Sequence, residues 1–311
     1  MKERVCVAGA TGHLGIALVE ELCSRNVDVV AVARNSHSSN VARIRQLGAT
    51  VVFVDASKSQ ESYYGALSSA SIAITCLAAG YKNVDSSSDF WAIDRDANIR
   101  FGKEAIKTGV QHLLIVATFE GKESRYKSEF SEAKEEAVDV LEKECRNAGV
   151  AFTVLRPNAY FKDLTDRAFE SVVSQGCHIV LGDGSHHINP VAREDVAKFI
   201  VKCIQEKQSG EFKLGGPDVF TFREIGTLAA DVAGKADELQ VKKIPLWLLR
   251  LLAFALSFIG WLYRPARRQA ALVNWMLYCS THDAIAPICG ERSLRDEYTR
   301  KFNALKTGSK H

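Results

Sequence analysis

Three glycines at a spacing of three residues stand directly after the first apolar segment of this chain. Val5–Ala8 has the continuous apolar character of a buried strand. Gly9, Gly12 and Gly15 follow it. In such a turn the first glycine permits a tight bend, the second lets the backbone approach a pyrophosphate, and the third lets the next helix pack closely. With helical spacing after the turn and a second strand over 27–33, the run predicts a dinucleotide-binding βαβ unit. The alternative is an ordinary glycine-rich turn.

The start of the following helix adds a second anion-binding feature. Helix N-termini offer backbone N–H groups and a partial positive charge, both of which suit a phosphate group. We therefore assign cofactor binding to the turn and the first helical residues. These are Gly9, Thr11, Gly12, His13, Leu14 and Gly15.

The residues after the second strand indicate which dinucleotide is bound. NAD sites usually carry Asp or Glu there to bind the ribose 2′-hydroxyl, whereas residues 33–39 contain no carboxylate. Arg34 can instead hold a 2′-phosphate by two parallel charge-assisted hydrogen bonds, assisted by the hydroxyls of Ser36 and Ser38. Arg34 thus favours NADP(H). The alternative is a solvated loop arginine.

Asp55 follows the third predicted strand, 51–54, at a position suited to the adenine amino group. A carboxylate at the end of a strand is equally suited to capping a helix or closing a turn. Both roles stay open for Asp55.

The length and composition fit one large core, or a nucleotide domain with an appended lobe. Of the 311 residues, 47% are hydrophobic, which excludes disorder as the dominant state. The chain has 40 basic and 37 acidic residues, so it lacks the strong positive charge typical of nucleic-acid binding.

The eight cysteines show neither a CxxC pair nor zinc-like spacing. They are expected to be small buried hydrophobic residues of a reducing compartment. No metal site is expected, because histidines and carboxylates never fall at ligand spacing on one element. Since the first strand starts at residue 4 or 5, we see no signal or transit peptide. We expect a cytoplasmic protein or one peripheral to a membrane.

Strand and helix patterns alternate through the first half of the chain. Near-continuous apolar runs such as Ile72–Leu77 and Leu113–Val116 are typical of parallel strands buried on both faces. The alternation predicts an α/β fold with a doubly wound parallel Rossmann sheet, an NADP-binding domain in residues 1–156. Strands are expected near 4–8, 27–33, 50–54, 71–77, 112–117 and 151–155. Helices are expected at 13–25, 39–47, 60–68, 89–108 and 129–148.

The pattern changes in residues 157–311, which are expected to form a smaller mixed C-terminal substrate lobe with return segments to the sheet. A hairpin is predicted through Gly182–Gly184. Thr221 and Glu224 have the spacing of a capping box for a helix that ends near Gly234. Further helices are expected near 165–175 and 193–206, and a short strand at 211–214.

Together these motifs resemble an atypical short-chain dehydrogenase/reductase of the NmrA-like type, closest to the divinyl chlorophyllide 8-vinyl reductase-like branch. The resemblance rests on the glycine turn, on the run Leu155–Lys162 and on Gly182–Gly184. It continues through Asn189–Val191, Glu194–Ala197, Gly215–Pro217 and Thr281–Pro287. It implies a nicotinamide cofactor and hydride transfer to a substrate.

The resemblance also places a lysine at the catalytic centre. The family's ordinary centre is a serine at the end of strand five and a Tyr-x-x-x-Lys one helix later; the tyrosine relays a proton and the lysine holds the nicotinamide ribose. Lys134 matches the lysine, whereas Phe130 stands at the tyrosine position and Ala117-Thr118 near the serine. The phenylalanine agrees with the vinyl-reductase branch and argues against tyrosine-type alcohol or ketone catalysis. Lys134 is assigned a catalytic and ribose-binding role; the alternative is a solvent-facing lysine paired with a neighbouring glutamate.

Without that tyrosine, the proton for a reduced double bond needs another source. Tyr160 is the side chain assigned to this catalytic role, with a protonated solvent molecule, His186 and His187 as alternatives. The histidines are more typical of a solvated hairpin, and Tyr126 is a further substitute acid. Asn98 resembles a family position near the nicotinamide, or is a helix-surface amide.

Leu246–Tyr263 is the most apolar segment of the second half, with Arg250 as its one charge. Its length is at the lower edge of what crosses a bilayer, about 17–25 residues. It is expected to roof an apolar substrate pocket, or to lie in a membrane interface with tryptophans and arginines at headgroup level. Spanning is rejected, because it would place the family-like tail across the membrane. Basic residues flank the segment: Lys242, Lys243, Arg264, Arg267 and Arg268.

These patterns predict an NADPH-dependent oxidoreductase that transfers hydride to a conjugated double bond, or to a carbonyl, of a hydrophobic small molecule. The alternative is a non-catalytic NADP(H) binder, a redox sensor or an assembly factor, which the missing tyrosine permits. No nucleic acid partner is expected. Peripheral membrane association through residues 246–263 stays open.

Overall fold

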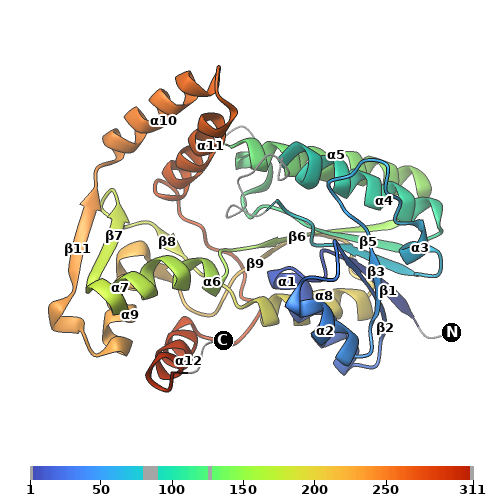
Figure 1. Ribbon diagram of the computed structural model, residues 1–311, viewed down its shortest axis with the longest axis horizontal. Coiled ribbons are helices and arrows are strands. Elements are labelled where there is room, and N and C mark those ends of the chain that lie inside the picture. Colours follow the sequence, from blue (N-terminus) through green and yellow to red (C-terminus); the bar gives the residue numbers. More distant parts are fainter. Residues whose placement is uncertain (1–2, 80–89, 125–127, 309–311) are drawn as a thin grey trace. The chain divides into compact units, whose positions relative to one another are not determined.

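The computed structural model describes residues 3–79, 90–124 and 128–308 (Figure 1). The chain forms two compact units. Unit 1 is built from residues 1–156 and 196–212, and unit 2 from residues 157–195 and 213–311.

Unit 1 is built on a seven-stranded sheet in the order β3-β2-β1-β4-β5-β6-β9. Every pair from β3 through β6 is parallel. The order of the strands reverses between β1 and β4, which is the kind of switch point where open α/β sheets bind ligands. The strands are β1 (Arg4–Ala8), β2 (Asp28–Ala33), β3 (Thr50–Phe53), β4 (Ile72–Thr75), β5 (His112–Val116), β6 (Ala151–Pro157) and the returning β9 (Gly210–Leu214).

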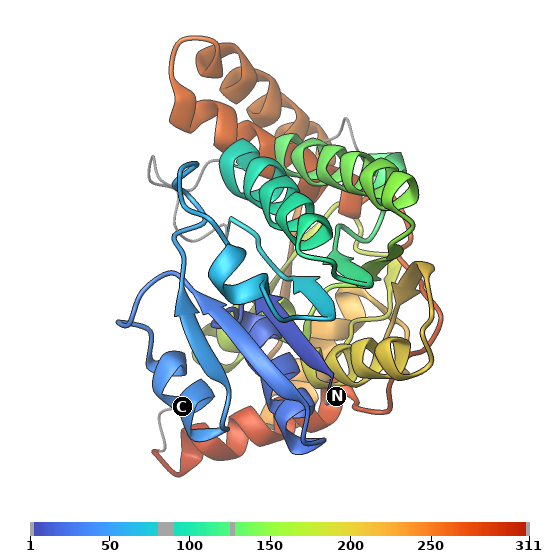
Figure 2. The ribbon, with the colours of Figure 1, turned by 90° about the vertical axis from the view of Figure 1, so that its right-hand side faces the viewer.

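Helices cover both faces of this sheet, with α4 and α5 on one face and α1, α2 and α8 on the other (Figures 1 and 2). Because both faces are covered, the central strands are almost entirely apolar, and Val7, Ile74 and Leu114 are fully buried. The predicted doubly wound Rossmann fold is confirmed. The helices are α1 (His13–Ser24), α2 (Ser39–Gln46), α3 (Tyr64–Leu67), the π-helix η1 (Trp91–Ala97), α4 (Asn98–Lys107), the 3₁₀-helix η2 (Gly121–Ser124), α5 (Glu129–Ala148) and α8 (Arg193–Gln205).

Two predicted helices of unit 1 differ from the structure. The helix expected over 60–68 is only the four-residue α3. The N–H of Tyr63 donates to the Glu104 carboxylate and the N–H of Tyr64 to the Ser62 hydroxyl, so the helix begins only at Tyr64. The helix expected over 89–108 runs without a break over residues 90–107, but its first part, η1, has the wider π-helical turn. The amide of Asn98 donates to two carbonyl oxygens of η1, and such an inserted side chain widens the helical turn.

A buried ion pair joins α5 to β6. The Arg156 guanidinium donates to both carboxylate oxygens of Glu135, at 2.7 and 2.9 Å, and both side chains are fully buried. Arg156 also donates to Glu211, at 2.6 Å, and to the Thr118 carbonyl. Burial alone lowers the pKa of Arg156, but the two carboxylates raise it above its ordinary value. The guanidinium therefore stays charged inside unit 1.

Unit 2 contains two small sheets. β8 (His187–Ile188) pairs antiparallel with β10 (Phe220–Thr221), and β7 (Cys177–Leu181) pairs parallel with β11 (Gln240–Ile244). The hairpin predicted through Gly182–Gly184 is therefore wrong, since β7 and β8 belong to different sheets. The turn is held by other elements: Gly182 donates to the carbonyl of Ile244, and the carbonyl of Gly184 accepts from Arg223.

One group of helices in unit 2 packs around α9 (Phe222–Ala233). The predicted capping box is confirmed, because the Thr221 hydroxyl accepts from the Glu224 amide while the Glu224 carboxylate accepts from the Thr221 amide. Phe169, Ile225 and Tyr298 are buried in one apolar cluster between these helices. The other helices are α6 (Phe161–Leu164), the π-helix η3 (Thr165–Phe169), α7 (Glu170–Gln175), the 3₁₀-helix η4 (Ala236–Glu238), α10 (Leu246–Gly260), α11 (Arg264–Cys279) and α12 (Leu294–Lys306).

The predicted apolar segment forms α10 and the turn after it, and α10 packs lengthwise on α11. Leu249 and Ala253 of α10 are buried with Val273 of α11 in a small cluster. No helix in the described part of the chain is both long and apolar enough to span a bilayer.

The buried pair gives a stability prediction. Arg156→Ala leaves the Glu135 carboxylate buried without its guanidinium, which is expected to lower the free energy of unfolding by about 3–5 kcal/mol. The control Arg146→Ala removes an exposed pair with Glu142 on the same helix as Glu135 and should cost less than about 1 kcal/mol. Urea denaturation of both variants measures the difference, and equal losses would contradict it.

Candidate functional site

The glycine turn brings β1, α1 and β4 into backbone contact. Gly9 has a φ of +77°, and a Cβ there would lie 2.9 Å from the carbonyl carbon of Cys76. A Cβ on Gly15 would overlap the carbonyl oxygen of Gly9. Larger residues are excluded at both positions, as expected where a strand, a helix start and a ligand's phosphates share little space.

The start of α1 suits an anion. Gly12 is its N-cap, and no acidic residue stands in the first turn, which contains His13 and Leu14. The first turn of a helix has N–H groups without partners inside the helix. These groups can donate hydrogen bonds to phosphate oxygens. The loop is also tied to α2, because the Asn40 amide donates to the carbonyl oxygen of Thr11 at 2.9 Å. No motif in the sequence signals this contact.

Arg34 and Asp55 lie at the ends of neighbouring strands. Arg34 directly follows β2, its side chain is 59% exposed, and its Nε lies 4.0 Å from Asp55 Oδ1. Asp55 accepts from the amide and the hydroxyl of Ser57, so the predicted turn role is present. Although burial alone raises the pKa of Asp55, the Ser57 hydrogen bonds, with Arg34 and Lys58, hold it below its ordinary value. The adenine role of Asp55 stays a prediction, as does the phosphate role of Arg34.

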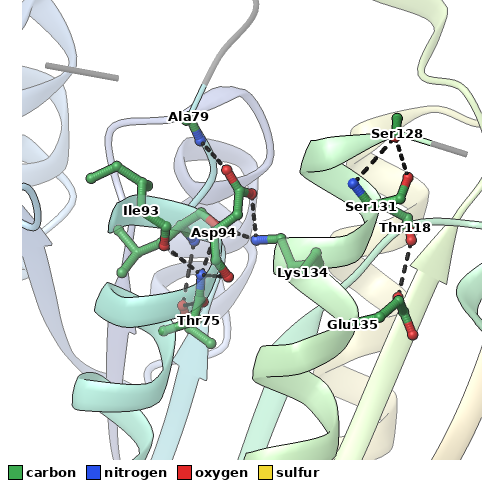
Figure 3. Close-up of polar contacts among 11 residues, drawn as sticks. Thr75, Ala79, Ile93, Asp94, Thr118, Ser128, Ser131, Lys134 and Glu135 are labelled. Carbon is green, nitrogen blue, oxygen red and sulfur yellow. Dashed lines mark hydrogen bonds and ion pairs between the residues drawn. The ribbon is translucent and has the colours of Figure 1, made fainter. Parts of the chain in front are cut away.

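Lys134 lies in a buried polar cluster at the carboxyl end of β4 (Figure 3). Its Nζ lies 2.9 Å from Asp94 Oδ1 and donates to the carbonyl oxygen of Leu77 at 2.5 Å. The alternative of a solvent-facing lysine paired with Glu135 or Glu136 is wrong. The helical phase of α5 directs Lys134 toward η1, and Glu135 toward the buried Arg156 instead.

Asp94 and Asn98 complete this cluster. Asp94 accepts from the amide of Ala79 at 3.0 Å, which fixes the carboxylate that pairs with Lys134. Asn98 is fully buried, accepts from the Thr75 hydroxyl and donates to the Leu77 carbonyl. The interpretation of Asn98 as a surface amide is therefore wrong. Asp94 was missed from the sequence, where its one signal is the helical four-residue spacing from Asn98.

The positions of the usual serine and tyrosine hold no available hydroxyl. Phe130 is buried, with its ring 5.8 Å from that of Phe90. Thr118, beside the serine position, donates its hydroxyl to Glu135 at 3.0 Å. Phe130 therefore cannot relay a proton as the family's tyrosine does, and the Thr118 hydroxyl is directed to Glu135.

The other predicted proton sources are in unit 2 or outside the described residues. Tyr160 is partly buried directly before α6, where its backbone bridges to Val191. His186 and His187 have partly exposed side chains that both approach Asp283, which agrees with a solvated role. Tyr126 lies outside the described residues. Among residues 3–79, 90–124 and 128–308, no three or more His, Cys, Asp or Glu side chains lie together in a group that could hold a metal ion.

Comparison with known proteins decides the family. A family model described as NAD(P)H-binding matches residues 9–207, from the glycine turn to the end of α8. The chain belongs to the NAD(P)H-binding family. The dinucleotide unit predicted from the glycine spacing is confirmed.

Relatives of this NAD(P)H-binding protein include both enzymes and an assembly factor. Divinyl chlorophyllide a 8-vinyl-reductase of Cucumis sativus is 27% identical over 282 residues, which are 86% of this chain and 65% of that protein. Photosystem II assembly factor Ycf39 of Trieres chinensis is 23% identical over 257 residues, which are 82% of this chain and 76% of that protein. The predicted resemblance to the vinyl-reductase branch is confirmed, although the match spans less than two thirds of the vinyl reductase.

Among solved structures, the triphenylmethane reductase of Citrobacter sp., complexed with NADP(H), superposes with a TM-score of 0.68. The match covers 96% of this chain and 99% of that one at 18% identity. A likeness at this identity shows a shared fold. It agrees with the Rossmann architecture of unit 1.

Proposed function

We propose that this protein is an NADPH-dependent reductase of a conjugated carbon–carbon double bond in a hydrophobic small molecule. One observation carries the proposal: Lys134 is held by Asp94 at the switch point while Phe130 replaces the proton-donating tyrosine. The residues that would orient a nicotinamide are present, whereas the hydroxyl that serves alcohol and ketone reduction is missing. Relatives named as vinyl reductases support a double bond as the group reduced.

The residues of unit 1 fit a dinucleotide along its whole length. The glycine turn leaves room where a Cβ would collide, and α1 offers N–H groups for the pyrophosphate. In the proposal Arg34 binds the 2′-phosphate and Asp55 the adenine amino group. The nicotinamide supplies hydride when it is bound.

Lys134 is suited to holding the nicotinamide ribose. An ammonium has three N–H donors, and in the described chain two of them point to Leu77 and Asp94. The third can bind a ribose hydroxyl. Asp94 also balances the charge, so the lysine is held in place without attracting the substrate electrostatically.

The carbon of the double bond that does not receive hydride must be protonated by a donor other than residue 130. Hydride added to one end of a conjugated double bond leaves negative charge at the other end, which takes up a proton. In the proposal this proton comes from Tyr160 or from solvent. A conjugated substrate tolerates a weak or distant donor, because its own π-system spreads the negative charge.

The second candidate function is non-catalytic NADP(H) binding in an assembly factor or redox sensor. It is favoured by the absence of a hydroxyl at Phe130 and by the Thr118 hydroxyl being hydrogen-bonded to Glu135. The relative named as an assembly factor supports it.

Turnover separates the two functions. Purified protein is mixed with NADPH and a panel of vinyl porphyrins, enones and quinones, and NADPH absorbance is followed with product mass. The reductase proposal expects consumption with at least one conjugated alkene and a mass gain of two hydrogens. Tight NADPH binding with no turnover on the whole panel would favour the binder.

Arg34 should set the cofactor preference. Arg34→Asp removes charge-assisted hydrogen bonds and repels a 2′-phosphate, so the ratio of NADPH to NADH affinity should fall by about 10- to 100-fold. Arg43→Asp, an exposed arginine on nearby α2, is the matched control. Titration calorimetry gives both affinities. An unchanged ratio in Arg34→Asp would show that another group binds the phosphate.

Lys134 should act on the nicotinamide end of the cofactor. Lys134→Met is expected to weaken NADP⁺ binding about tenfold, the loss of one charged hydrogen bond, while the affinity for 2′,5′-ADP stays constant. Lys143→Met, exposed on the same helix, is the control. Lys134→Met leaves the buried Asp94 carboxylate without its cation, which can destabilise the fold. The double variant Lys134→Met/Asp94→Asn removes that unpaired charge, so a loss of binding that persists in it is due to the missing lysine. Equal weakening of both ligands would contradict the assignment.

A further inference from the structure

The outer side of α10 is an exposed apolar face. Residues at helical spacing of three and four form one stripe along its length and into the turn that follows. Their exposed fractions run from 57% to 86%, for Trp247, Leu251, Phe254, Phe258 and Trp261. A second stripe beside it, Leu248, Leu252 and Ile259, is 45–49% exposed. Contiguous exposed apolar surface of this kind marks an interaction site.

The apolar face exists because α10 packs through its opposite side. Leu249 and Ala253 are buried against α11. At the end of α10, a Cβ on Gly260 would lie 2.7 Å from the Arg267 Cα, so the two helices meet at backbone contact there. Figure 1 shows this hairpin, α10–α11, extending from the β7–β11 sheet of unit 2. The hairpin thus has its own packing, which leaves the outer stripes uncovered.

The charges within the stretch that contains this face have one sign. Residues 239–282 contain six Lys or Arg and no Asp or Glu, in a chain with 40 basic and 37 acidic residues. Lys242 and Lys243 are exposed on β11, and Arg250 and Arg267 are exposed on the hairpin. Since the charged side chains of this stretch are all cationic, it suits a partner that is apolar within and anionic at its surface.

Two kinds of partner are considered for the apolar face of α10: a second copy of this chain and a lipid bilayer. A second copy in a symmetric dimer would bring the same cations opposite one another, with no carboxylate of residues 239–282 to balance them. An anionic lipid bilayer offers hydrocarbon to the stripes and phosphate groups to the lysines and arginines. Trp247 and Trp261 stand near the two ends of the stripe, and tryptophan favours the headgroup level.

We propose that the α10–α11 hairpin docks on the surface of an anionic lipid bilayer, with α10 lying in the interface plane. This docking does not depend on the reductase function. It extends the membrane-interface interpretation of Leu246–Tyr263 by assigning the contact to the outer stripes of α10 and the charge preference to the surrounding cations.

Vesicle flotation of the full chain tests the proposal. We expect the protein to float with vesicles of phosphatidylcholine plus phosphatidylglycerol, at least about tenfold more than with phosphatidylcholine alone, and to be released by salt. Tryptophan fluorescence should shift to the blue on binding. The shift should shrink in the variant Trp261→Phe.

Variants on the stripe locate the contact. Phe254→Glu and Phe258→Glu, both at exposed positions, should reduce flotation at least about tenfold. Leu305→Glu, an exposed leucine on α12, is the matched control and should float as the unchanged protein does. Lys242→Glu/Lys243→Glu should abolish the preference for anionic vesicles. Circular dichroism and NADPH affinity, measured on each variant, show that the fold is kept.

Three results would overturn the proposal. The first is a folded protein that floats with neither vesicle type, or equally with both. The second is unchanged flotation of Phe258→Glu. The third is a dimer in lipid-free sedimentation that Phe258→Glu dissociates, because a second copy would then cover the face.

Discussion

The arrangement of the candidate site in unit 1 depends on the close approach of three backbone segments at the glycine turn. Gly9 and Gly15 let the end of β1, the start of α1 and the end of β4 meet where any side chain would overlap a carbonyl group. That contact leaves space at the switch point and directs the first turn of α1 to it. The polar groups that can act on a dinucleotide, from Arg34 to Lys134, follow from the same arrangement of strands.

The cluster around Lys134 is held together without the residue at the usual tyrosine position. The lysine is fixed by Asp94 and Leu77, and both of these are fixed in turn by Ala79 and Asn98. None of these contacts uses residue 130. The position of Lys134 is therefore structurally independent of residue 130, and phenylalanine there leaves the cluster intact.

The two sides of α10 place their hydrophobic residues differently. The inner side of α10 is buried with α11, whereas the larger side chains, such as Phe254 and Trp261, remain outside. Large aromatic side chains lose most from exposure to water. They lie outside on a stretch of sequence, residues 239–282, that contains Lys and Arg but no Asp or Glu, unlike the balanced charge of the whole chain.

The sequence by itself determined the sheet, the glycine turn, the capping box of α9 and the candidate lysine, because each depends on local spacing or on a family motif. It did not determine that Asp94 is the partner of Lys134, that Arg156 pairs with Glu135 inside unit 1, or that β7 and β8 separate after Gly182. These contacts join residues far apart in the chain. Their geometry depends on helical phase and strand pairing, which only the tertiary structure decides.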